Sequence, residues 1–238
     1  EFDARNGGWG GAPKFPQPMT IEFLLRLHQR TGDERPLAMA RRTLDAMAAG
    51  GIYDHLGGGF ARYATDAIWL VPHFEKMLYD NALLARAYLH AWQVTREPRY
   101  REVVEETLAF VVRELRTADG GFASSLDADT DGEEGATYVW SADEVRAVLG
   151  EDAAAFMAAY DVTENGNWEG HNILQRVAPV DDDVRASARR LFETRARRPQ
   201  PGRDDKVLTA WNGLMIAAFA EAGAALGERR WLDAAADA

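Results

Sequence analysis

The sequence contains 238 residues, 47% of them hydrophobic and 10% aromatic, and this composition supports a sizeable core rather than a disordered chain. Asp and Glu number 38 and Lys and Arg 27, a net charge of −11 that disfavours nucleic acid and anionic membrane surfaces as partners. Cysteine is absent, so disulfides and thiolate metal sites are excluded within these residues. No apolar run approaches the ~20 residues of a membrane span, and the first residues do not resemble a signal peptide, so we expect a cytoplasmic location.

One short turn recurs along the chain. It reads T-G-D-E-R-P-L-A from Thr31, T-R-E-P-R-Y from Thr95, L-G-E-D-A-A-A-F from Leu149 and L-G-E-R-R-W-L from Leu226. Each copy joins one amphipathic segment to the next, and similar units at such a spacing are typical of a helical repeat array. The pattern predicts about four helical hairpins.

The segments beside these turns have the apolar spacing of helices. Apolar faces run from Ile21 to His28, from Leu37 to Ala48, from Tyr100 to Leu115 and from Leu208 to Ala222. The arginine-rich segment from Asp181 to Arg198 predicts an additional outer helix.

The remaining connections are long and rich in Gly, Asp and aromatic residues. They span 1–17, 50–71, 118–140 and 161–180, and they alternate with the short turns, so all should emerge on one face of the array. This asymmetry favours an all-α fold, a partial (α/α)6 toroid, with a small β-ribbon near 121–140 in one long loop and a short strand at A-T-Y-V-W-S. We expect residues 1–238 to be a single domain, a fragment of a toroid that lacks its last hairpins and exposes the apolar flanks of those it retains.

The stretch from Gly50 to Asn81 concentrates the groups that could carry chemistry. Pro72 suits the first position of a helix, which would place His73 and Glu75 at a helix mouth with Tyr79 one turn further on. His titrates near neutrality, so His73, Glu75, His55 and Tyr79 are the candidate catalytic residues. The alternative is a structural loop whose polar groups satisfy one another.

Other loop residues combine aromatic faces with amide or carboxylate edges, which suits a polyhydroxylated ligand. The candidate substrate-binding residues are Asp54, Trp69, Asp127, Trp168, Glu169, Asp205, Trp211 and Asn212. The segment from Asp127 imitates the start of a calcium loop, but Tyr138 stands where an EF-hand needs Glu, and no nucleotide or dinucleotide fingerprint is present. We therefore expect neither a metal nor another cofactor.

Six motifs together resemble one family, the thioredoxin-domain proteins of the spermatogenesis-associated type. They are A-P-K-F-P at Ala12, G-G-I-Y-D-H-L-G-G-G-F at Gly50, W-L-V-P-H-F-E-K-M-L-Y-D at Trp69, S-L-D-A-D with E-G-A-T-Y-V-W, N-G-N-W-E-G-H-N-I-L at Asn165, and D-D-K-V-L-T-A-W-N-G-L-M-I at Asp204. The resemblance implies an upstream thioredoxin-like domain followed by an (α/α)6 barrel similar to N-acylglucosamine 2-epimerases and six-hairpin glycosidases.

Two function classes follow from the residues and the resemblance. One is a carbohydrate-related barrel, a sugar epimerase, isomerase or glycosidase-like enzyme that takes a small sugar ligand. The other is a non-catalytic binding or scaffold module attached to the thioredoxin-like redox domain. For the first we expect His73 and Glu75 at the floor of the largest pocket and His55 within hydrogen-bonding reach of a carboxylate.

Overall fold

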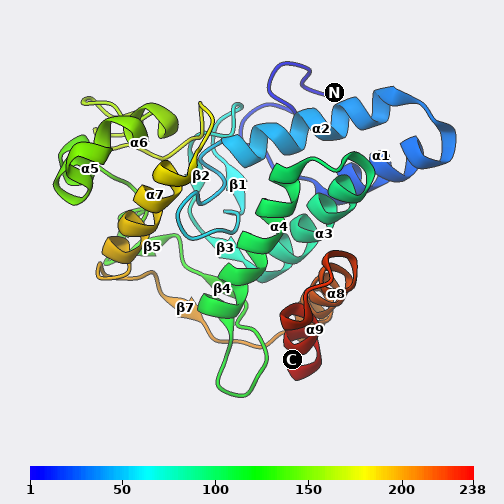
Figure 1. The fold of residues 1–238 in the computed structure, drawn as a ribbon. Coiled ribbons are helices and arrows are strands. Elements are labelled where there is room, and N and C mark those ends of the chain that lie inside the picture. Colours follow the sequence, from blue (N-terminus) through cyan, green and yellow to red (C-terminus); the bar gives the residue numbers. More distant parts are fainter.

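The computed structural model describes residues 1–238, and three long helical hairpins form its main body (Figure 1). They are α1 (Pro18–Thr31) with α2 (Glu34–Ala49), α3 (Leu78–Thr95) with α4 (Pro98–Phe110), and α8 (Thr209–Leu226) with α9 (Arg229–Asp237). Helix α4 continues as a π-helix over Val111–Leu115. The predicted all-α fold is confirmed, and all four predicted apolar faces lie in hairpin helices. The face in α8 packs against both α3 and α9.

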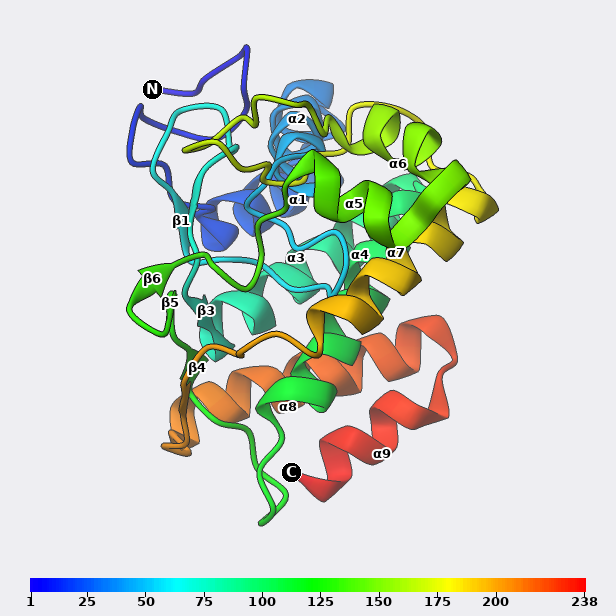
Figure 2. The ribbon, with the colours of Figure 1, turned by 90° about the vertical axis from the view of Figure 1, so that its left-hand side faces the viewer.

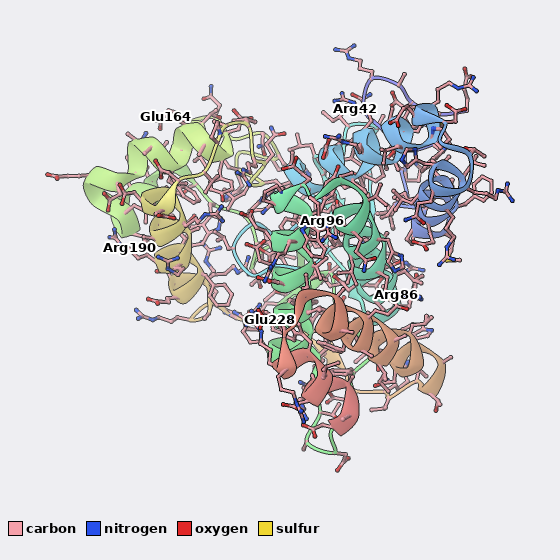
Figure 3. The ribbon with its side chains drawn as sticks, turned by 45° about the vertical axis from the view of Figure 1, so that its right-hand side comes forward. Arg42, Arg86, Arg96, Glu164, Arg190 and Glu228 are labelled. Carbon is pink, nitrogen blue, oxygen red and sulfur yellow. The ribbon has the colours of Figure 1, made fainter.

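The hairpins are arranged in two curved layers. Helix α3 lies between α1 and α8, and these three form one layer. Two side-chain bonds of 2.8 Å from Arg86 of α3 to Glu221 reinforce the contact with α8 (Figure 3). In the second layer, the Tyr100 hydroxyl of α4 donates to Asp45 of α2 at 2.7 Å. The result is an arc of hairpins.

Local signals in the sequence set the ends of these helices. Pro18 and Pro98 occupy first-turn positions, where the missing amide hydrogen costs nothing. Asp33 caps α2 by accepting a hydrogen bond from the Arg35 amide at 2.9 Å. Gly32 ends α1 with a φ of 70°, a left-handed conformation that glycine adopts without strain.

The turn at Leu149 joins two helices, as predicted, but they stand apart from the arc. Helices α5 (Ala142–Leu149) and α6 (Ala153–Tyr160) are short and pack against α7 (Asp182–Arg195), the predicted additional helix. Trp140, Phe156 and Leu191 belong to a separate core shared by these helices. The fourth hairpin therefore forms an α5–α7 unit beside the arc rather than part of its curved layers (Figure 1).

Short strands organise the long loops. Strand β1 (Tyr63–Ala64) pairs with β2 (Pro72–His73), β4 (Ser125–Leu126) pairs with both β3 (Lys76–Met77) and β7 (Arg203–Asp204), and β5 (Asp129–Thr130) pairs with β6 (Glu133–Glu134), all antiparallel. The β5–β6 hairpin confirms the predicted β-ribbon. The strand predicted at A-T-Y-V-W-S is wrong, because only Trp140 of that segment forms a bridge, with Asn172.

Pro72 begins a strand and not a helix, which is a second correction. The backbone of His73 pairs with Tyr63, and Lys76 pairs with Leu126, so the chain stays extended until α3 begins at Leu78. Consequently His73 lies in strand β2 and Glu75 in the connection between β2 and β3, both before α3. Tyr79 is therefore not one helical turn from Glu75.

The long loops meet on one side of the molecule, as predicted (Figure 2). Lys14 pairs with Ala64, and Ser125 pairs with Asp204. Elsewhere the arc leaves apolar surface uncovered, since Met19 and Phe23 of α1 are 66% and 60% exposed. Not one of the helices has both the length and the apolar character to cross a bilayer.

Candidate functional site

His73 lies in a cluster of charged and aromatic side chains, which we call the His73 cluster. It consists of Arg62, His73, Glu75, Tyr79, Asp80, Glu134 and Trp211. The Nδ1 atom of His73 donates to Glu134 at 2.8 Å, its Nε2 lies 3.7 Å from Glu75, and its ring stacks on Tyr63. Arg62 donates to Glu75 at 3.0 Å. The side chains of His73 and Glu75 are 28% and 24% exposed. Solvent therefore reaches both side chains, and neither is a wholly buried structural group.

Asp80, Arg62 and Glu134 are members of this cluster that were not among the candidates predicted from the sequence, and Asp80 is the most informative of them. It lies in the first turn of α3 and is only 8% exposed, and no protein group donates to its Oδ2 atom. Burial raises the pKa of Asp80 to about 7, although Tyr79 and Arg62 act in the opposite direction. The Nε atom of Arg62 is likewise buried without an acceptor. The sequence feature that could have indicated Asp80 is the presence of an acidic residue inside the apolar run L-Y-D-N-A-L-L.

Aromatic side chains flank the cluster. The rings of Tyr79 and Trp211, from the adjacent helices α3 and α8, lie 4.8 Å apart and are both partly exposed. Trp168 packs against Phe74, with ring centroids 5.6 Å apart. The structure thus brings Trp211 against Tyr79, the neighbour of Asp80 in α3, and the two rings form the kind of apolar surface on which a sugar ring packs.

A second group, the Asp54 cluster, consists of Asp54, Lys76 and Arg195 and is buried. Lys76 donates to Asp54 at 2.7 Å, and Arg195 donates to both of its carboxylate oxygens at 2.8 Å. These two cations hold the pKa of Asp54 well below its usual value despite the opposing effect of burial. The cavity beside the cluster measures about 30 Å³, room for one water molecule, so the cluster is structural.

The glycines of the central stretch allow this arrangement. Gly58 and Gly59 have φ values of 76° and 83°. A Cβ atom on Gly58 would lie 2.4 Å from the Glu106 carbonyl, and one on Gly59 would lie 2.5 Å from the Phe110 ring. The loop can therefore lie directly against α4, as the glycine density predicted.

His55 does not lie within reach of a carboxylate, so that prediction is wrong. Its Nε2 atom bonds to the Gly50 carbonyl at 3.0 Å, while the neighbouring Asp54 carboxylate is taken by Lys76 and Arg195. Burial, together with the positive charge of Arg99, lowers the pKa of His55 to about 3. His55 is therefore neutral near pH 7 and unsuited to proton transfer there.

Two predicted ligand contacts are used within the fold instead. Trp69 is completely buried, and its Nε1 donates to the Asn6 carbonyl at 3.0 Å. The amide of Asn212 bonds on both sides to the backbone of Phe122. Neither side chain can contact a ligand, because no surface or hydrogen-bonding group is left free.

The remaining candidates are dispersed. Asp127 and Glu169 are exposed at separate loops, and Asp205 pairs with Arg203 at 2.6 Å. Asp205 lines the largest of the five principal cavities, about 620 Å³ between α7 and β7. His73 and Glu75 line none of these five cavities, so the prediction that they form the floor of the largest pocket is wrong. No group of His, Asp and Glu is arranged to hold a metal ion.

The fold is that of part of an (α/α)6 barrel. An inactive variant of the α-1,6-mannanase GH76A from Salegentibacter sp. HEL1_6, solved with α-1,6-mannotetrose, superposes with a TM-score of 0.55 and 15% identity. The match covers 94% of this chain and 45% of the mannanase. A second inactive variant, with α-1,6-mannotriose, gives 0.54. At this identity the likeness concerns the fold alone.

Sequence comparison gives a nearer relative, human spermatogenesis-associated protein 20. It is 39% identical over 98% of this chain, and the mouse protein of that name is 38% identical over 95%. The chain spans 35% and 34% of the length of these two relatives. No protein-family model matches the chain.

Proposed function

We propose that the His73 cluster is the acid–base centre of a carbohydrate-active site, and specifically of a glycosidase-like one. The observation that carries the proposal is Asp80, a buried carboxyl group whose pKa of about 7 lets it hold a proton near neutrality. Glu75, by contrast, accepts a hydrogen bond from Arg62 and faces solvent. Two carboxyl groups in such different environments are suited to the roles of general acid and general base.

The roles follow from these environments. Protonated Asp80 would donate its proton to the leaving oxygen of a glycosidic bond, and Glu75 would take a proton from the attacking water. Tyr79 and Trp211 would pack against the sugar ring beside Asp80. Hydrolysis is preferred over epimerisation by a pair of histidines, because His55 is buried, neutral and bonded to Gly50.

The fold neighbours support a saccharide ligand, since two of them were solved with α-1,6-linked manno-oligosaccharides. We infer that this chain supplies barrel hairpins to a longer protein whose upstream thioredoxin-like domain is its partner. The motifs that resemble the thioredoxin-domain family support this domain organisation.

A binding or scaffold module is the second candidate. It is favoured by the internal satisfaction of His73 and Glu75, which bond to Glu134 and Arg62 within the fold. Such a module would bind a saccharide or a partner without turnover.

Calorimetry and product analysis on the full-length protein test the proposal. The probes are mono- and disaccharides, their N-acetyl forms and α-1,6-mannobiose. We expect saturable binding and release of a monosaccharide, and we expect Asp80→Asn and Glu75→Gln to abolish release while binding persists. The control Asp233→Asn, an exposed carboxylate paired with Arg229 on α9, should leave both unchanged. Binding without release favours the module, and no binding at millimolar concentration contradicts the carbohydrate proposal.

A further inference from the structure

A basic cleft lies where α4 of the arc meets the α5–α7 unit. His55, Leu56 and Tyr160 are among the residues that line its cavity of about 150 Å³. Four arginines line it, Arg99, Arg176, Arg185 and Arg189. In a chain with a net charge of −11, such a concentration of positive charge at one concave site is local and specific.

Three of these guanidinium groups converge on one carboxylate. Arg185 donates to Glu102 at 2.8 Å and Arg99 donates to it at 3.2 Å. Arg176 lies 3.9 Å from the same carboxylate, beyond hydrogen-bonding distance. One negative charge therefore positions three positive ones and cannot neutralise them.

The second carboxylate of the cleft does not restore neutrality. Glu106 accepts a hydrogen bond from the buried Tyr53 hydroxyl and lies 3.6 Å from Arg99. Four guanidinium groups thus face two carboxylates. The cleft keeps an excess of positive charge in a partly desolvated place, where a bound anion is attracted more strongly than at the open surface.

Two of the arginines keep their donors free. Arg176 forms no side-chain hydrogen bond, and Arg189 forms neither a side-chain hydrogen bond nor an ion pair, yet both line the cavity. Burial and the nearby charge of Arg99 lower the pKa of Arg176 from its usual value, as expected where like charges are held together. A guanidinium group with free donors is suited to bidentate recognition of phosphate oxygens, and both the half-buried Arg176 and the exposed Arg189 have them.

We propose that this cleft binds the phosphate group of a small phosphate monoester. A second cavity, of about 430 Å³, shares Arg99 and Arg176 with the first. Ala48, Ala49 and Pro179 give it apolar walls, and the carboxylate of Asp45 also lines it, so it takes an uncharged organic part of the ligand while the guanidinium groups hold the phosphate. This site is separate from the His73 cluster, and its assignment does not depend on the proposed carbohydrate chemistry.

Calorimetry at fixed ionic strength tests the assignment, with glycerol 3-phosphate and inorganic phosphate as probes on the full-length protein. We expect saturable binding of both and tighter binding of the monoester. Each removed guanidinium should weaken binding about tenfold or more, because it takes away charge-assisted hydrogen bonds to the phosphate oxygens. The test variant Arg176→Ala with Arg189→Ala should therefore lose measurable binding.

The control variant Arg30→Ala with Arg197→Ala removes the same charge from two exposed positions that form no side-chain bonds. It should bind both probes as the unmodified protein does. Both double variants should have the melting temperature of the unmodified protein. Equal losses in the two double variants, or no saturable binding at millimolar concentration, would overturn the phosphate site. Equal affinity for the two probes would overturn the role of the second cavity. Asp80→Asn should bind glycerol 3-phosphate normally, which separates this outcome from failure of the carbohydrate proposal.

Discussion

The side-chain amide of Asn212 forms two hydrogen bonds with the backbone of Phe122, which lies 90 residues earlier in the chain. Its Oδ1 accepts from the Phe122 amide at 2.8 Å, and its Nδ2 donates to the Phe122 carbonyl at 3.0 Å. Asn81 does the same for Phe60, at 2.8 and 3.1 Å. The first turns of α8 and α3 thus each hold an incoming loop through the same paired contact.

Replacing Asn212 by alanine is expected to destabilise the fold. Both backbone groups of Phe122 are buried and would lose their partner, at a cost of about 1–3 kcal/mol each. Urea unfolding of Asn212→Ala measures the change. Asn165→Ala, at an exposed position without side-chain bonds, is the matched control and should unfold at the original midpoint.

Replacing Asp54 is expected to destabilise the fold more than replacing Asn212. Asp54→Ala would leave Lys76 and Arg195 buried without a counter-charge, which costs about 3–5 kcal/mol. Because the folded-state pKa of Asp54 lies well below 3.8, its contribution is present above pH 3.8 and is lost as the pH falls from there. Thermal melts of the variant and of the unmodified chain between pH 7 and pH 2 should converge in acid, and parallel curves would contradict this account.

His55 gives stability a separate dependence on pH. Its pKa falls from 6.5 in the unfolded chain to about 3 in the fold, so between these values the unfolded state binds more protons. Stability should therefore decrease below pH 6.5, with a slope of at most about 1.4 kcal/mol per pH unit. His55→Gln should remove this slope, whereas His171→Gln, at an exposed histidine, should retain it.

Asp80 gives stability the opposite dependence on pH. Its pKa rises from 3.8 to about 7 on folding, so the folded state binds more protons between these values and stability declines as the pH rises through that range. Asp80→Asn should melt at a higher temperature than the original protein at pH 8 and lose the proposed glycosidase activity. A lower melting temperature at pH 8 would show that the ionised carboxylate is structurally required.

The exposed apolar side chains of α1 predict self-association. Met19 and Phe23 are more than half exposed on one helix, and such a patch favours contact between molecules. Sedimentation velocity should show association that rises with concentration and weakens in Met19→Lys with Phe23→Glu. Ile68→Lys with Val207→Glu changes two apolar side chains that are also at least half exposed but lie elsewhere, and it should associate as before.

The sequence predicted the helices well because their signals are local. The apolar spacings from Ile21 to Leu25 and from Leu37 to Ala48 act within a few turns, and both appear in the structure as buried helix faces. The position of α5 and α6 could not be predicted in this way. Their turn resembles the others, but their apolar faces pack on α7. This packing is determined by contacts between residues distant in sequence, which a local pattern does not reveal.

The candidate site was predicted only in part, for a similar reason. His73, Glu75, Tyr79 and Trp211 do gather, because the long loops share one face. His55 was misjudged since its neighbour Asp54 binds Arg195, a partner 141 residues away. Asp80 was overlooked because an acidic residue in an apolar helix acquires its raised pKa only from the burial that packing produces.

The carboxylate of Asp54 also sets an order of events during synthesis. Arg195 is made long after Lys76, so until it is made this carboxylate has at most one of its two cations. The first two hairpins must therefore remain incompletely neutralised at this junction until α7 leaves the ribosome. Nascent chains arrested before residue 195 should be cleaved readily by protease near residue 54, and chains released after it should resist.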